Sequence, residues 1–145
     1  MCFQDNISDP HGRVCGKWEA VICRNESELD ECIRFSRLPE GFSKYRQHIP
    51  IANIWPMAVL NKIHVDKADQ GRGFGRAGLS AFYDQARQTG ALLAFGKVGW
   101  STSGDDVEKG MQRSLSFYER GGWVLLPRKD YEPYFVYREL GPQRA

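Results

Sequence analysis

Asp69-Gln-Gly-Arg-Gly-Phe-Gly-Arg-Ala-Gly78, DQGRGFGRAG, holds four glycines and two arginines in ten residues and decides how the chain around it folds. A glycine in a helix interior costs roughly 0.5–1 kcal/mol relative to alanine, because its extra backbone entropy is lost on folding. So dense a run indicates backbone that must stay bare for the close approach of a ligand. Residues 41–98, which surround the run, hold eight Lys/Arg against three Asp/Glu, and this excess of positive charge favours an anion.

The segments on either side of the glycine run predict a strand before it and a helix after it. Residues 57–65 alternate, with Val59 and Ile63 on one face. Residues 74–90 carry apolar side chains at helical spacing and end at a glycine. Further strands are expected at 17–24, 91–98, 123–126 and 134–140, and further helices at 27–38, with Ser27 as N-cap, and at 107–120. Strands that alternate with helices predict an α/β fold.

Two segments fit no regular element. Residues 1–16 are polar and are interrupted by a proline and two glycines, so we expect a loosely held terminus. Residues 42–56 combine aromatic residues with two prolines. Their aromatic side chains either line a substrate pocket or belong to the core, and the candidates are Tyr45, His48 and Trp55.

Two common phosphate-binding loops fit the glycine run poorly. A Walker loop requires Gly-Lys-Ser/Thr after the glycines, and the sequence has none there. Gly73-Phe-Gly75-Arg-Ala-Gly78 matches the dinucleotide pattern GxGxxG. That motif begins where a strand ends, whereas here five polar or small residues, DKADQ, follow Val65. The expected acidic residue about 20 positions further on is also missing, so an oxidoreductase remains a distant alternative.

A third pattern fits the spacing and extends beyond the loop. QGRGFG at 70–75 matches the Q/R-x-x-G-x-G/A signature of the acetyl-CoA-dependent N-acyltransferases of the GNAT superfamily, and FYERGGW at 117–123 resembles the second hallmark of that superfamily. The resemblance covers about residues 57–126. It implies a single acyltransferase domain over 1–145, with a mixed central sheet flanked by helices and a V-shaped splay between the strands at 57–65 and 91–98.

The resemblance also implies acetyl-CoA as acyl donor. Backbone N–H groups at a helix N-terminus form a positive concavity that suits its pyrophosphate. The pantetheine arm would pair with the strand before the loop, at Ile63 and Val65. The superfamily often uses an asparagine at the position that is Met111 here. Ser101, or its neighbours Thr102 and Ser103, would supply a replacement hydrogen bond; capping of the turn is the alternative role for these residues. The implied loop contacts are Gln70, Gly71, Arg72, Gly73, Phe74, Gly75 and Arg76.

For the chemistry, the resemblance points to Tyr118 as the general acid that protonates the departing thiolate. Packing in an amphipathic helix is the alternative role for this side chain. Many superfamily members carry a glutamate as general base on the preceding strand, but residues 57–65 contain no carboxylate. His64 is the only titratable residue there with a suitable pKa, so it is the candidate base. Otherwise it is a solvated surface residue, and solvent deprotonates the amine.

The acceptor implied by the resemblance is a primary amine on a small molecule, a protein or a charged tRNA. Nucleic acid is expected as a partner only in the last case, in which the chain could be a toxin with an antitoxin partner; a homodimer is also possible. A different class of function is a non-catalytic CoA-binding or inhibitory module on the same fold.

The four cysteines all lie in the first 32 residues and have no metal-binding spacing, so no metal site is expected. No apolar run approaches the length of a membrane span, and the first residues lack a signal-peptide pattern. We therefore expect a cytoplasmic protein with reduced thiols and no membrane partner.

Overall fold

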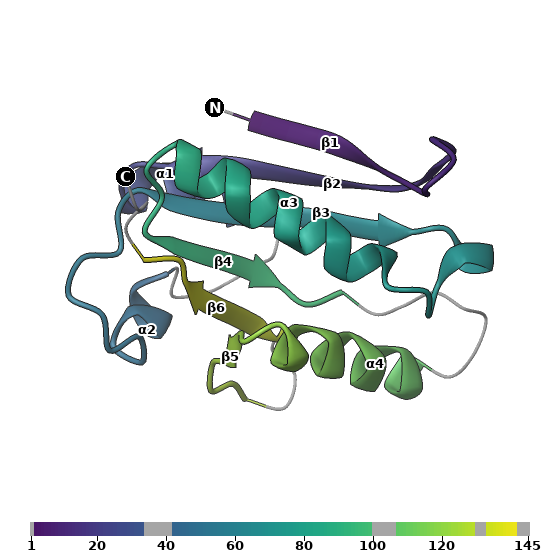
Figure 1. Ribbon diagram of the computed structural model, residues 1–145. Coiled ribbons are helices and arrows are strands. Elements are labelled where there is room, and N and C mark those ends of the chain that lie inside the picture. Colours follow the sequence, from purple (N-terminus) through teal and green to yellow (C-terminus); the bar gives the residue numbers. More distant parts are fainter. Residues whose placement is uncertain (1, 34–41, 100–106, 130–132, 142–145) are drawn as a thin grey trace.

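The computed structural model of the chain describes residues 2–33, 42–99, 107–129 and 133–141. Its centre is a six-stranded sheet in the order β1-β2-β3-β4-β6-β5 (Figure 1). All neighbouring strands are antiparallel except β3 and β4, which are parallel. The strands are β1 (Cys2–Ser8), β2 (Val14–Cys23), β3 (Met57–Val65), β4 (Leu93–Lys97), β5 (Val124–Leu125) and β6 (Phe135–Glu139).

Helices cover both faces of this sheet, which confirms the predicted fold class. They are α1 (Glu26–Ile33), α2 (Ser43–Arg46), α3 (Phe74–Gln88) and α4 (Val107–Arg120), with a short 3-10 helix, η2 (Lys67–Asp69). Figure 1 shows α3 lying across the sheet and α4 beside the end of β6. Among the described residues, no helix combines the length and apolar character needed to cross a bilayer.

The sheet separates two hydrophobic cores. Alternation along β3 sends Ala58 and Leu60 to the core under α3 and α4, whereas Met57 and Val59 enter the core under α1 and α2. The first core is centred on Trp18, which is fully buried. Packing on this first core, the larger of the two, holds α3 and α4 on the same face of the sheet. The glycine run at 69–78 and the FYERGGW motif at 117–123 meet there.

The expectation that residues 1–16 form a loosely held terminus is wrong. Cys2–Ser8 pairs with β2 along its whole length. Ile7 is 4% exposed and faces the first core, while most of its strand neighbours are exposed, as in an edge strand. A side-chain oxygen of Asp9 accepts hydrogen bonds from the backbone N–H groups of His11 and Arg13, both at 2.9 Å. Pro10 and Gly12, which lie between Asp9 and Arg13, therefore mark a hairpin turn.

The first helix begins earlier than the sequence predicted. α1 starts at Glu26, and Asn25 Oδ1 accepts a hydrogen bond from the backbone N–H of Glu28 at 3.0 Å. The backbone N–H of Arg24 in turn donates to the Glu28 carboxylate at 3.0 Å. Asn25 is therefore the N-cap, in place of the predicted Ser27.

Residues 42–56 close the second core. Tyr45 is fully buried against Phe135, with ring centroids 5.1 Å apart, and Trp55 packs on Phe42. His48 is exposed. None of the three aromatic candidates in this segment lines the cavity described below, so Tyr45 and Trp55 are core residues.

Candidate cofactor-binding and active site

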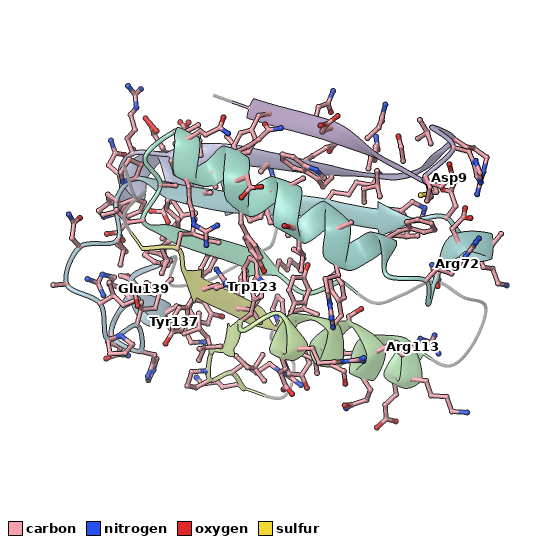
Figure 2. All side chains as sticks on the ribbon, viewed as in Figure 1. Asp9, Arg72, Arg113, Trp123, Tyr137 and Glu139 are labelled. Atoms are coloured by element: carbon pink, nitrogen blue, oxygen red, sulfur yellow. The ribbon has the colours of Figure 1, made fainter. Side chains whose placement is uncertain are left out.

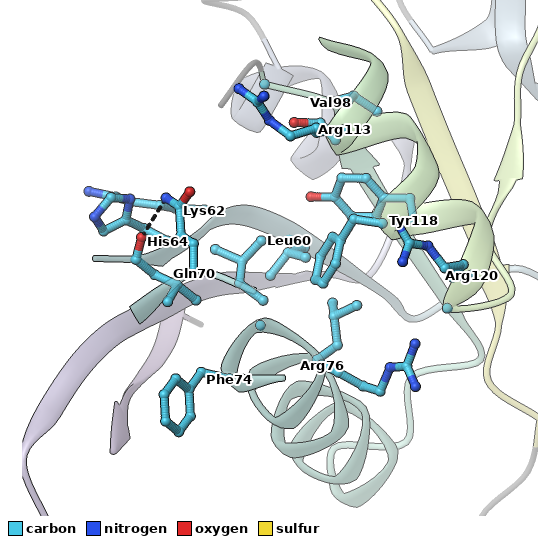
Figure 3. A pocket seen from close by; sticks show the side chains of 18 of the residues that line it. Leu60, Lys62, His64, Gln70, Phe74, Arg76, Val98, Arg113, Tyr118 and Arg120 are labelled. Atoms are coloured by element: carbon cyan, nitrogen blue, oxygen red, sulfur yellow. Dashed lines mark hydrogen bonds between the residues drawn. The ribbon is translucent and has the colours of Figure 1, made fainter. Parts of the chain in front are cut away.

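A cavity of about 840 Å³ opens where β3 and β4 part. Their parallel pairing runs only from Met57 opposite Leu93 to Leu60 opposite Gly96, although β3 continues to Val65. This separation confirms the predicted V-shaped splay. The end of β3, the glycine loop, the start of α3 and the inner face of α4 form the walls (Figure 3).

A β-bulge explains why β3 turns away at this point. Glu19 of β2 pairs with Lys62 and its neighbour Ala20 pairs with Leu60, so Asn61 is an extra residue in β3. A bulge bends its strand and increases the local twist. Because Leu60 is also the last residue of β3 that pairs with β4, the bend and the opening of the cavity coincide.

Beyond the bulge, one edge of β3 faces the cavity. The backbone N–H of Asp66 donates to the carbonyl of Cys15, near the start of β2, at 2.7 Å. Main-chain groups alternate in direction along a strand, so those of Val65 and Ile63 point to the opposite edge. Gln70 confirms this direction for Val65, because its Nε2 donates to the Val65 carbonyl at 3.0 Å (dashed in Figure 3). Gln70 thereby ties the glycine loop to β3.

The glycine loop ends directly in the first turn of α3. Gly71 and Gly73 have φ values of 81° and 87°, in the left-handed region that side chains other than glycine rarely adopt. Gly73 is the N-cap, and its carbonyl accepts the N–H of Ala77 at 3.1 Å. The N–H groups of residues 74–76, in the first turn of α3, have no hydrogen-bond partner within the helix and lie at its positive end. This terminus borders the cavity and fits an anionic phosphate group.

Two further glycines of the run control packing. A Cβ atom at Gly75 would lie 3.0 Å from Cε1 of Phe117 on α4, and one at Gly78 would lie 2.6 Å from Cδ1 of Ile7 on β1. Glycine at these positions allows α3 to approach both neighbours closely. The density of glycine in the run therefore serves helix packing as well as the loop.

The buried carboxylate of Asp69 supports the start of the glycine loop. The Asp69 side chain is 3% exposed, and its Oδ1 accepts a hydrogen bond from Nη2 of Arg13 in the β1–β2 turn. Nη1 of Arg72 lies 3.6 Å from the same oxygen. Asp69 Oδ2 is buried without a hydrogen-bond partner among the described residues. Figure 2 shows Asp9 of the turn and Arg72 at the same end of the molecule.

The two arginines of the run occupy different places. Arg76 borders the cavity. The Arg72 side chain is 63% exposed and does not border it; its guanidinium lies 5.6 Å from the ring centroid of Phe74, which does. Of the two, Arg76 therefore lines the cavity, whereas Arg72 lies on the outer side of the loop beside Asp69.

Tyr118 reaches the same cavity from α4. Its residue is 6% exposed, its ring packs against Trp123 and Phe117 at 5.2 and 5.4 Å, and its hydroxyl points into the cavity (Figure 3). Burial, with a smaller contribution from the nearby Tyr83, raises the pKa of the Tyr118 phenol well above its ordinary value. The phenol therefore keeps its proton at neutral pH and can donate it.

His64 lies at the outer wall of the cavity on β3. Its side chain is 50% exposed, and its Nε2 is 3.5 Å from Oδ1 of Asp66. Ser101 lies outside the described residues. Met111, which stands where the superfamily often has an asparagine, packs against the first core, and Ser114 borders the cavity.

Basic residues that the sequence reasoning missed also line the cavity. They are Lys62, Lys97, Arg113 and Arg120. Strand alternation could have placed the lysines, and the helical spacing of the arginines around Phe117 could have placed the other two. Among the described residues, no group of three His, Cys, Asp or Glu side chains is arranged to hold a metal ion.

The fold is that of the GNAT acetyltransferases. A GNAT-family acetyltransferase from Staphylococcus aureus Mu50 is similar over 96% of this chain and 68% of its own, with 13% identity and a TM-score of 0.60. The PaiA N-acetyltransferase of Thermoplasma acidophilum, solved with coenzyme A, is similar over 95% and 60%, with 14% identity and a TM-score of 0.57. An acetyltransferase from Bacillus cereus matches over 96% and 73%, with 12% identity and a TM-score of 0.58. No protein-family model and no curated protein sequence matches the chain.

Proposed function

We propose that the protein is an N-acetyltransferase that transfers an acetyl group from acetyl-CoA to a primary amine. One observation carries the proposal: the positive N-terminal end of α3 and the hydroxyl of Tyr118 border the same cavity, between two splayed strands. The fold shared with acetyltransferases, one of them solved with coenzyme A, supports the choice of cofactor. The first-turn amides of α3 and Arg76 would hold the pyrophosphate, and the edge of β3 at Ile63 and Val65 would hold the pantetheine arm.

Acetyl-CoA supplies the thioester on which the reaction takes place. The amine nitrogen attacks the thioester carbonyl carbon, a C–N bond forms, and the C–S bond breaks. Tyr118 donates its phenolic proton to the departing thiolate sulfur. The amine gives up its own proton, which returns to the tyrosine through solvent, so that protons balance over the cycle. The phenol, whose pKa is about 10 in an unfolded chain and is raised by burial, carries its proton at neutral pH and can donate it when the thiolate departs.

His64 is the candidate for accepting the amine proton. It borders the cavity, and Oδ1 of Asp66 lies 3.5 Å from its Nε2. Replacing it in the variant His64→Ala should lower kcat at pH 7 and leave the KM for acetyl-CoA unchanged. An unchanged kcat would assign the deprotonation to solvent.

The cofactor is tested by thermal unfolding with acetyl-CoA, with NADH as the control ligand. A ligand at 100 times its dissociation constant stabilises a fold by about 2.7 kcal/mol, which raises the midpoint visibly. We expect a rise with acetyl-CoA alone. A rise with NADH alone would replace the proposal by dinucleotide binding, and no rise with either would remove the cofactor.

The acid is tested by following thiol release in Tyr118→Phe. Loss of a general acid should lower kcat by about 10²–10⁴-fold. Acetyl-CoA should still raise the unfolding midpoint. Tyr137→Phe is the matched control, because this tyrosine is equally buried but lies in the second core.

A non-catalytic CoA-binding module is the second candidate function. The absence of a carboxylate from residues 57–65 favours it. Stabilisation by acetyl-CoA without thiol release on a broad panel of amines would support the module and exclude the enzyme.

A further inference from the structure

The cavity has a second face, on the side of the sheet away from α3 and α4. Ile63 and Val65 pack against the first core, under α3 and α4, so the side chains that alternate with them, Lys62 and His64, point to the opposite face. On β4, Phe95 belongs to the second core, and Lys97 follows it by two residues. Lys62 and Lys97 therefore lie on the same face, one on each of the two strands that part.

The other charges on this face are largely paired. Lys17 Nζ lies 3.1 Å from Oε1 of Glu19, the residue that pairs with Lys62 across β2 and β3. Asp66 is engaged by His64, as described above. Among the described residues that border the cavity, the single carboxylate is Asp69, which is buried and bound by Arg13. The lining is thus basic well beyond what the glycine loop contributes.

We propose that the acceptor carries an anionic group, a phosphate or a carboxylate, that binds Lys62 and Lys97 beside the reacting amine. The inference rests on the proposed function, because it assigns this face to the acceptor. If the cofactor occupies the side of α3 and α4, the opposite face is left for the amine. Both lysines are exposed and line the cavity, one from each of the two strands. A polycationic amine would be repelled there, whereas an anionic acceptor is attracted.

The same two lysines assist the chemistry. An anion beside an amine raises the pKa of that amine and holds it as the unreactive ammonium form. Positive side chains around the anion offset this effect, so more of the amine is neutral when it meets the thioester. This offset matters in a site whose preceding strand offers no carboxylate base.

Matched pairs of acceptors test the proposal by thiol release. O-phosphoserine is compared with serine amide, and phosphoethanolamine with ethanolamine, at low ionic strength; spermidine is the cationic reference. We expect kcat/KM to be at least tenfold higher for the anionic member. The preference should fall towards one in Lys62→Gln/Lys97→Gln and in 0.5 M salt. Lys109→Gln is the matched control, because this lysine is exposed on α4 outside the cavity.

A nucleic acid backbone offers the same phosphate chemistry, so a charged tRNA forms the second arm. Acetylation of charged tRNA that depends on both lysines, without a preference among the small amines, would assign the anion to nucleic acid. Equal rates within every pair and no lysine dependence with tRNA would overturn the inference and leave the acetyltransferase intact.

A binding measurement separates this failure from failure of the proposed function. In protein saturated with CoA, O-phosphoserine or charged tRNA should raise the unfolding midpoint more than serine amide or other amines that carry no phosphate. This rise should disappear in the double lysine variant. If CoA binds and neither anionic probe has this effect, the inference is wrong even where no turnover is seen. If CoA itself does not bind, the proposed function is wrong.

Discussion

The phenol of Tyr118 sits among aromatic rings at the inner wall of the cavity, and its environment has a measurable consequence for stability. Its pKa is about 10 in an unfolded chain and is raised in the folded protein by burial. A raised folded-state pKa gives stability that is fully present below pH 10 and is lost as the pH rises further. The folded state should therefore weaken at alkaline pH through this single group.

We expect the free energy of unfolding to fall above pH 10 by up to about 1.4 kcal/mol per pH unit on account of Tyr118. Urea unfolding of the wild type and of Tyr118→Phe between pH 8 and 11 measures the difference. Other alkaline groups, such as the Cys23 thiol whose pKa burial raises to about 12, contribute equally to both proteins. Identical slopes would show that the phenol is not buried.

Asp69 and Arg13 give the second prediction at this scale. Arg13→Ala removes the hydrogen-bond donor of a carboxylate that is 3% exposed and leaves it only Arg72 at 3.6 Å. An uncompensated buried polar group costs about 1–3 kcal/mol, and this loss of stability should be largely recovered in Arg13→Ala/Asp69→Asn. A double-mutant cycle by urea unfolding measures the coupling.

The exposed ion pair of Arg24 with Glu28 is the matched control, and its cycle should give well under 1 kcal/mol. Because Asp69 precedes the glycine loop, Arg13→Ala should also weaken acetyl-CoA binding. Full affinity together with unchanged stability would contradict the role of Asp69 as the support of the loop.

At the scale of secondary-structure elements, the contact between β2 and β3 holds the cavity wall in place. A Cβ atom at Gly16 would lie 2.2 Å from the backbone carbonyl oxygen of His64, which cannot move aside without moving β3. At Gly96 of β4 the nearest atom, the Leu60 carbonyl oxygen, would be 3.5 Å away, an ordinary contact.

Gly16→Ala should therefore destabilise the fold by about 1–3 kcal/mol and weaken acetyl-CoA binding, as overpacking against backbone does. Gly96→Ala should cost less than 1 kcal/mol. Thermal unfolding with and without acetyl-CoA, recorded for both variants, compares them directly. A tolerated Gly16→Ala would mean that β2 and β3 are further apart at this end.

The sequence predicts an element well where the element's own residues mark it and poorly where contacts with other segments define it. β3 and α4 were predicted with their exact bounds, because apolar periodicity marked them. β1 was missed, because its partner β2 supplies the backbone hydrogen bonds and an exposed edge needs few apolar residues. The N-cap was placed two residues late, since Asn25 and Ser27 are both good caps and only the contact to Glu28 distinguishes them.

At the scale of the whole molecule, the sequence located the loop and the tyrosine but not the surroundings that join them. The splay between β3 and β4 was predicted through the resemblance, whereas the bulge at Asn61 that accompanies it has no local sequence signal. The partnership of Arg13 with Asp69 spans 56 residues and needs the hairpin, so it was invisible without β1. Lys62 and Lys97, on the face away from α3 and α4, come from two different strands, so only the pairing of β3 with β4 in the sheet brings them together.

The whole-molecule arrangement leads to the last prediction, on amide hydrogen exchange. A cofactor wedged between the splayed strands should protect the edge of β3 at residues 63–65 and the amides of residues 71–76. β1 and β5 close the two ends of the sheet, away from this opening, and should be unaffected. Exchange measured with and without acetyl-CoA, and with NADH as control, tests this pattern. Protection confined to β5, or spread evenly over all six strands, would place the ligand elsewhere and would separate the glycine loop from the site that Tyr118 faces.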